Sequence, residues 1–264
     1  MALVAGDAGC DDLFGLCETQ LHICNESLSN RSHTISIDGI SMEFPDWRFN
    51  IRASNTEPVI RLNIETRGDR SLLDRALRIV TRVVHELGPA HAWRLPEHFD
   101  ESWTPELEYN ADTPAHPFRP YGATIGHWLE WARLALHLRA ALGASAPSWL
   151  LDDTRSLFEA SVKEGWAVDG ADGFVYTVDW SGRPVVRERM HWVAAEATAT
   201  AAALFHATGE STYDDWYRTW WDHVADVFLD HDLGSWRHEL DADNRPSGVV
   251  WNGKPDAYHA FQAT

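Results

Sequence analysis

The chain has 264 residues, 44% of them hydrophobic, which is enough to bury the core of one large domain or two small ones. Its 22 basic and 40 acidic residues give a net charge of −18, which argues against nucleic acid and anionic membranes as partners. No apolar run approaches the roughly 18 residues that span a bilayer, and Met1 to Asp7 contain no basic leader. These features predict a cytoplasmic protein in which Cys10, Cys17 and Cys24 are free thiols.

Strand patterns begin after residues 1–32, to which no element is assigned. Residues 34–44 alternate apolar and polar side chains around Asp38-Gly39, which favours a turn, and residues 47–52 and 59–65 alternate in the same way. Residues 54–58 read as the loop between the last two strands. We therefore expect a small strand-rich α+β segment over residues 33–69.

From Ser71 onward the apolar spacing changes to the helical period, so we place a domain boundary near residues 67–70 and a second domain over residues 70–264. The predicted helices cover 71–87, 125–142, 147–164, 188–208 and 212–230, and one more begins near 255. Residues 169–183 are the exception and predict a β-hairpin between two helices.

The segment Gly126-His-Trp-Leu-Glu-Trp131 places an imidazole and a carboxylate three residues apart at the start of a predicted helix. Residues with this spacing lie one above the other on a helix, so His127 and Glu130 suit proton transfer on a polar substrate. Glu130 has an alternative partner in Arg133, three residues further on. The 14 tryptophans favour a carbohydrate ligand, because indole rings pack against the apolar faces of sugars.

The run from Trp47 to Glu65 resembles the C-terminal domain of phosphomannomutases and phosphoglucomutases, in which the equivalent loop cradles the phosphate of a sugar phosphate. The resemblance covers about residues 33–69. It implies a phosphate site. An arginine guanidinium with neighbouring hydroxyl and amide groups suits the oxygens of a phosphate, and the segment offers Arg52, Ser54, Asn55 and Thr56. A polar turn between strands is the alternative. The phosphorylatable serine and the acidic metal loop of that family match nothing in this chain.

Residues from about 69 to 264 resemble the N-acylglucosamine 2-epimerase superfamily, with most likeness to its sulfoquinovose and mannose isomerases. The motifs that carry the resemblance occur in the family's order: Pro96-Glu-His-Phe-Asp100, Pro114-Ala-His-Pro-Phe-Arg119, Gly126 to Trp131, Asp169 to Trp180, Arg187-Glu-Arg189, Gly234-Ser-Trp236, Glu239-Leu-Asp241, Trp251, Gly253-Lys254 and Asp256-Ala-Tyr-His259. Members of the superfamily are (α/α)6 barrels. The resemblance thus implies a mainly α chain holding a partial barrel of about six helices.

The resemblance also implies an aldose–ketose isomerisation through a cis-enediol, without metal or organic cofactor. Its catalytic histidines match His127 and His259, and the neighbouring carboxylate matches Glu130. Arg119 matches a substrate-side arginine, and Trp192, Glu196 and Trp251 are expected to line the cavity, with packing as the alternative role. Arg187 and Arg189 are expected to brace loops, with substrate contact as the alternative role, and His191 is expected to be structural.

Three functions are open at this point. The first is a sugar isomerase that acts on a monosaccharide such as mannose or sulfoquinovose. Under this hypothesis the chain is either active or an inactive truncated or fused form, and a homo-oligomer is an open alternative to a monomer. The second is a non-catalytic module that binds a sugar or sugar phosphate. The third is a phosphohexomutase fragment.

Overall fold

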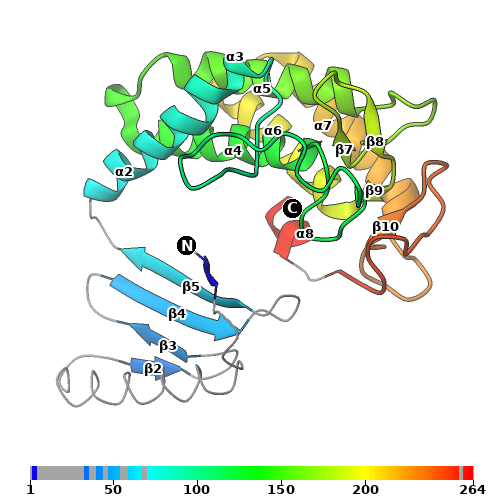
Figure 1. The fold of residues 1–264 in the computed structure, drawn as a ribbon, viewed down its shortest axis with the longest axis horizontal. Coiled ribbons are helices and arrows are strands. Elements are labelled where there is room, and N and C mark those ends of the chain that lie inside the picture. Colours follow the sequence, from blue (N-terminus) through cyan, green and yellow to red (C-terminus); the bar gives the residue numbers. More distant parts are fainter. Residues whose placement is uncertain are drawn as a thin grey trace. The chain divides into compact units, whose positions relative to one another are not determined.

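The computed structural model describes residues 70–255 and 258–263, without the side chain of residue 262, and the main chain of five strands within residues 1–69 (Figure 1). The chain divides into two compact units, Met1–Leu72 and Leu73–Thr264. The cysteines, for which free thiols were predicted, lie outside the described residues.

The first unit contains an antiparallel sheet in the order β1-β5-β4-β3-β2. Its strands are β1 (Ala2–Val4), β2 (His33–Ile35), β3 (Ile40–Glu43), β4 (Trp47–Ala53) and β5 (Val59–Thr66). The longest pairing joins β4 to β5, from Trp47 opposite Thr66 to Ala53 opposite Ile60. The period-two alternation of residues 34–65 predicted four of these strands, whereas β1 is too short to show such a pattern.

The second unit consists mainly of helices. The first helix runs without a break through α2 (Ser71–Val80), the π-helical η1 (Thr81–Leu87) and α3 (Gly88–Ala90). The others are α4 (Ile125–Leu142), the 3-10 turn η2 (Gly143–Ser145), α5 (Trp149–Gly165), α6 (His191–Thr208), α7 (Ser211–His223) with its π-helical continuation η3 (Val224–Phe228), and α8 (Tyr258–Ala263).

Helices α4 and α6 lie at the centre of this unit. Helix α4 packs against both α5 and α6, and α6 also packs against α7 and α8 (Figure 1). Alanines along α6, among them Ala197 and Ala201, are fully buried and allow close packing, while Trp128 and Leu129 of α4 fill the core. The first turns of these two helices are therefore fixed by packing on several sides.

A short strand directly precedes each of the two central helices. Strand β6 (Ala123–Thr124) leads directly into α4, and β9 (Arg189–Met190) leads directly into α6. Strand β6 joins the hairpin of β7 (Thr177–Val178) and β8 (Pro184–Val186), and β9 pairs with β10 (Glu239–Leu240). These pairings fix the direction in which each helix starts.

The predicted mainly helical fold is confirmed, and most helix boundaries agree within a few residues. Helix α6 begins three residues after the predicted start at 188, because Arg189 and Met190 pair with β10 instead. The hairpin predicted over 169–183 is present, but its paired strands lie later, at 177–178 and 184–186. No helix within the described residues is long and apolar enough to cross a membrane.

Candidate active site

Two histidines that lie far apart in the sequence pack against the same indole ring. His127 in the first turn of α4 has its ring centroid 5.1 Å from that of Trp192, the second residue of α6. His259 of α8 lies 5.6 Å from the same tryptophan. The structure thus brings together three predicted site residues that lie as much as 132 residues apart in the sequence.

Each histidine is held through its Nδ1 atom by a glutamate. Nδ1 of His127 forms an ion pair with Oε2 of Glu97 at 3.0 Å, and Nδ1 of His259 is hydrogen-bonded to Oε1 of Glu196 at 3.1 Å. Within residues 70–255 and 258–263, neither Nε2 atom has a protein hydrogen-bond partner. Each imidazole therefore keeps its second nitrogen for a ligand.

Gly126 makes room for this arrangement at the start of α4. A Cβ atom at this position would lie 2.3 Å from Cζ3 of Trp192 and 2.8 Å from Cγ2 of Val193. The Val193 side chain cannot move away easily, since it is fully buried and belongs to the core. The absence of a side chain at Gly126 therefore allows the indole to lie beside His127.

A buried ion pair fixes the glutamate that holds His259. Arg133 of α4 donates from Nε to Oε2 of Glu196 at 2.8 Å and from a terminal nitrogen to Oε1 at 3.0 Å, and both side chains are more than nine-tenths buried. Burial raises the pKa of Glu196, but hydrogen bonds from His259 and Arg133 outweigh it and hold that pKa below its usual value. The alternative pairing of Glu130 with Arg133 is wrong, because the guanidinium reaches across to α6.

The charge around His127 favours its protonated form. Burial lowers the pKa of His127, but the negative charge and close contact of Glu97 outweigh it, and Glu130 and Glu196 add to the effect, so that the pKa rises to about 9. The same contact holds the pKa of Glu97 below its usual value, against the effect of burial. Among the described residues Glu130 forms no hydrogen bond or ion pair, so it acts on His127 through its charge, and the partner that orients the imidazole is Glu97.

Arg119 lies near the site without touching either histidine. Its guanidinium donates to the hydroxyl of Tyr109 at 3.3 Å, and Tyr109 stacks on His98 with ring centroids 4.2 Å apart. Glu97, His98 and Tyr109 are among the residues that line a pocket of about 660 Å³. Arg119 is thus linked, through Tyr109 and His98, to the segment whose Glu97 pairs with His127.

Trp251 lies on a loop that a buried carboxylate organises. Glu239 of β10 accepts hydrogen bonds from the backbone amides of Val249, Val250 and Trp251, at 2.7 to 2.9 Å, and from the hydroxyl of Ser247. The indole of Trp251 stacks on His238, with centroids 5.5 Å apart, and meets Phe118 edge-on at 4.7 Å. Trp251 therefore packs between two loops.

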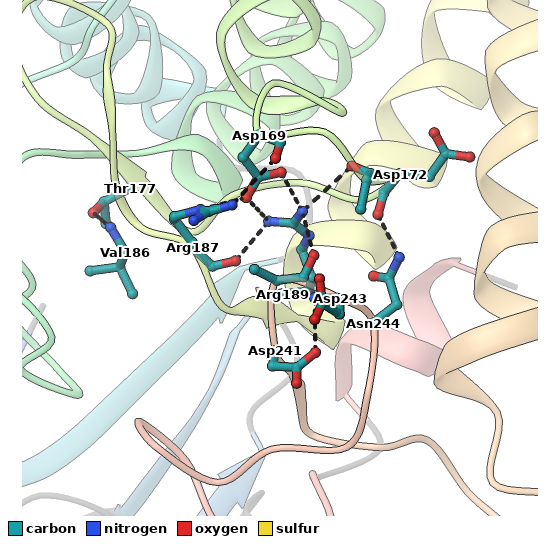
Figure 2. A network of polar contacts seen from close by, with 11 residues as sticks. Asp169, Asp172, Thr177, Val186, Arg187, Arg189, Asp241, Asp243 and Asn244 are labelled. Atoms are coloured by element: carbon teal, nitrogen blue, oxygen red, sulfur yellow. Dashed lines mark hydrogen bonds and ion pairs between the residues drawn. The ribbon is translucent and has the colours of Figure 1, made fainter.

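Arg187 and Arg189 brace loops, as expected. Figure 2 shows both guanidinium groups converging on Asp169, which Arg187 contacts at 2.9 Å and Arg189 at 2.6 Å. Arg189 is almost fully buried and also reaches the backbone oxygens of residues 187, 171 and 242, while Asn244 donates to the carbonyl of Asp172. Their side chains are thus engaged in joining the hairpin segment to the 241–245 loop.

His191 is buried beside this network, and its Nδ1 lies 3.3 Å from the carbonyl oxygen of His238. Its ring packs edge-on against that of His259, with centroids 6.3 Å apart. These contacts agree with the structural role expected of it.

The predicted phosphate site falls mostly outside the described residues. Ser54, Asn55 and Thr56 are not described, and Arg52 is described only as a main-chain position in β4, opposite Arg61 of β5. That site stays a prediction. In the part of the chain that the structure describes, no three His, Cys, Asp or Glu side chains are grouped so as to hold a metal ion.

Sequence reasoning assigned no role to Glu97, although it lies in the quoted motif Pro96 to Asp100. Its partner His127 is thirty residues away in sequence, and the pairing depends on where β6 places the start of α4. The carboxylate within helical reach, Glu130, was the only one that local spacing could identify.

Comparisons with known proteins agree with this architecture. A D-mannose isomerase of Thermobifida fusca is 57% identical over 198 residues, which cover 75% of this chain and 48% of that enzyme. A crystal structure of D-mannose isomerase superposes with a TM-score of 0.67 at 30% identity, over 74% of this chain and 49% of the other. The chain therefore spans about half the length of the isomerases that it matches.

A short part of the chain has a different relative. The phosphomannomutase of Escherichia coli (strain K12) is 57% identical over 49 residues, or 19% of this chain and 11% of that enzyme. This match supports the resemblance noted for the strand-rich segment. The family model for N-acylglucosamine 2-epimerase (GlcNAc 2-epimerase) nevertheless matches residues 1–263, and the chain belongs to that family.

Proposed function

We propose that this chain carries the catalytic groups of an aldose–ketose isomerase that acts on a monosaccharide such as D-mannose. The observation that carries the proposal is the pair of histidines that pack against Trp192, each held at Nδ1 by a glutamate and each with Nε2 left for a ligand. The similarity to D-mannose isomerases supports the choice of substrate class.

The proposed reaction moves protons between adjacent carbon and oxygen atoms of the open-chain sugar. A base removes the proton from C2 while O1 gains a proton, which gives a cis-enediol; C1 then gains a proton and O2 loses one, which gives the ketose. One acid and one base placed on the same side of the sugar are sufficient for both steps. Imidazoles suit them because they exchange protons near neutral pH.

The surroundings of the two histidines favour different roles. The raised pKa of His127, about 9, keeps its imidazole protonated at neutral pH, so His127 is the proposed acid. His259 is the proposed base, because the charge of its partner Glu196 is shared with the guanidinium of Arg133. Glu130 contributes negative charge beside His127.

The remaining predicted site residues are proposed to contact or enclose the sugar. The indole of Trp192, against which both histidines pack, suits the apolar side of a sugar ring. Arg119 can donate to sugar hydroxyl or enediolate oxygens if it leaves Tyr109, and Trp251 is proposed as a wall of the pocket. The predicted homo-oligomer and cytoplasmic location stay predictions.

The proposal is tested by incubating the chain with D-mannose labelled with carbon-13 at C2 and following the products by NMR. We expect the label at C2 of D-fructose, and we expect His259→Ala to abolish its appearance. Absence of fructose at high protein concentration, from a chain shown to be folded, would overturn the proposal.

A second, separable property is favoured by the 49-residue match to phosphomannomutase. We propose that Arg52, Ser54, Asn55 and Thr56 bind a phosphate group. Titration with mannose 6-phosphate and with inorganic phosphate tests it: binding of either, lost in Arg52→Ala, supports a phosphate site, and binding of neither contradicts it.

A further inference from the structure

We infer that Glu97 is the positioning residue of His127: it fixes the Nδ1 side of the imidazole, so that Nε2 is the nitrogen that serves the substrate. The inference deepens the proposed function and rests on it for its kinetic consequences. Its structural basis is independent of the substrate and lies in the contacts of one carboxylate.

Both oxygens of Glu97 are engaged at the start of α4. Oε2 pairs with Nδ1 of His127 at 3.0 Å, while Oε1 accepts a hydrogen bond from the backbone amide of Thr124, also at 3.0 Å. Thr124 is the last residue of β6 and immediately precedes the helix that carries His127. The helix start therefore fixes the rotation of the carboxylate, and the carboxylate in turn fixes the rotation of the imidazole.

Glu97 differs from the glutamate behind the other histidine. Glu196 shares its two oxygens between Arg133 and His259, so part of its charge is neutralised by the guanidinium. In the described part of the chain, no lysine or arginine pairs with Glu97, and His127 is its ion-pair partner. The negative charge of Glu97 is therefore not shared with a cationic side chain, and it favours the proton on His127.

Other charged groups around His127 do not provide the same contact. Glu130 on its own helix and Glu196 on α6 add negative charge, and His98 lies on the same segment as Glu97. None of the three has a hydrogen bond or ion pair with His127. They can alter how readily the imidazole binds a proton, but they do not select which nitrogen faces Glu97.

The chemical consequence concerns both protonation states of His127. When protonated, the imidazole directs Nδ1–H at Glu97 and offers Nε2–H to the sugar. After that proton has moved to the sugar, retention of the proton on Nδ1 leaves a lone pair on Nε2, ready to receive one back. Without Glu97 the neutral ring can carry its proton on either nitrogen, and part of the population has the wrong one.

The test is an NMR titration of the histidine side chains in the folded chain, with nitrogen-15 in the imidazoles. In Glu97→Gln we expect the pKa of His127 to fall by about one to three units, and we expect the nitrogen-15 shifts of the neutral ring to show a mixture of the two tautomers. Glu130→Gln should lower the pKa by less and leave the Nδ1–H tautomer in place. Glu101→Gln, an exposed change in the same segment, should alter neither quantity.

The kinetic arm uses the rate of mannose isomerisation against pH. If the pKa falls from about 9 to about 7, the protonated fraction at pH 8 falls about tenfold, and the rate with it. The pH at which the rate falls on the alkaline side should decrease by the same amount as the pKa of His127. Glu97→Asp keeps the charge and should recover part of the shift, which separates loss of the contact from loss of the fold.

The outcomes separate the inference from the proposed function. An unchanged pKa and tautomer of His127 in Glu97→Gln, or a larger change in Glu130→Gln, would overturn the role of Glu97 even if the chain is active. A wild-type chain that gives no fructose would overturn the isomerase proposal, and the titration would still show whether Glu97 positions His127.

Discussion

Replacing Arg133 by methionine should affect stability and the rate profile together. The guanidinium makes two hydrogen bonds to Glu196, at 2.8 and 3.0 Å, and the two side chains are 8% and 2% exposed. Methionine keeps the apolar part of the side chain but leaves the Glu196 carboxylate buried with His259 as its partner. Breaking one side of a buried pair in this way costs about 3–5 kcal/mol of unfolding free energy.

The same change should move the pH dependence of isomerisation. With the guanidinium gone, Glu196 takes up a proton at higher pH, and the protonated carboxyl no longer holds the Nδ1 side of the His259 imidazole as an ion pair. Isomerisation should therefore begin at higher pH, and the rise of the rate on the acidic side should shift upward. The pKa of Glu196 itself should move up from its depressed value, because burial is then opposed by fewer partners.

Arg94→Met is the matched control. Arg94 makes an equivalent two-pronged pair with Glu164, at 2.8 and 2.6 Å, but neither residue contacts His127 or His259. That pair is more exposed, with side chains 16% and 12% accessible, so its loss should cost less stability and leave the shape of the rate profile unchanged.

Urea denaturation and initial rates from about pH 5 to 10 measure both effects. Adding Glu196→Gln to Arg133→Met should restore part of the stability, because no uncompensated charge is then buried. The reasoning is refuted if Arg133→Met costs no more stability than Arg94→Met, or if its rate profile superposes on that of the wild type.

Three further predictions follow from single contacts. Gly126→Ala places a Cβ 2.3 Å from Trp192 and should cost about 1–3 kcal/mol in denaturation and most of the isomerase rate; a variant with unchanged rate would show that the indole position is unimportant. Glu239→Gln should speed hydrogen exchange at the amides of residues 249–251, which the carboxylate now holds; equal protection would contradict this. His127 has a folded pKa of about 9 against 6.5 for an ordinary histidine, so its stabilising effect is complete below pH 6.5 and lost as pH rises through 9. The difference in urea midpoint between wild type and His127→Gln should therefore narrow toward high pH. A difference that stays constant with pH would count against the ion pair.

Local patterns were sufficient for the helices that define the fold. Helix α4 was predicted with its exact bounds, because its apolar spacing stops at Gly143, whose φ of 58° is one that glycine adopts readily. The start of α6 was placed three residues early. Pairing of Arg189 and Met190 with a strand fifty residues later determines that boundary, and no local pattern contains this information.

The residues of the candidate site also divide into those that the sequence identifies and those that depend on distant contacts. His127 and His259 were recognised because family motifs surround them, and Trp192 and Glu196 were named as residues of a predicted helix, with packing as their alternative role. Glu97 was missed because its contact with His127 depends on a distant loop, whereas Glu130 was given the nearer role that helix spacing suggests.

The central claim is that His127 and His259 together move a proton between C2 and C1 of a sugar. Incubation with D-mannose in D2O tests it most directly, with NMR to locate deuterium. The account predicts deuterium at C2 of mannose or C1 of fructose with the wild-type chain, and none with His259→Ala. Product without solvent deuterium at either carbon, or undiminished exchange in His259→Ala, would contradict it.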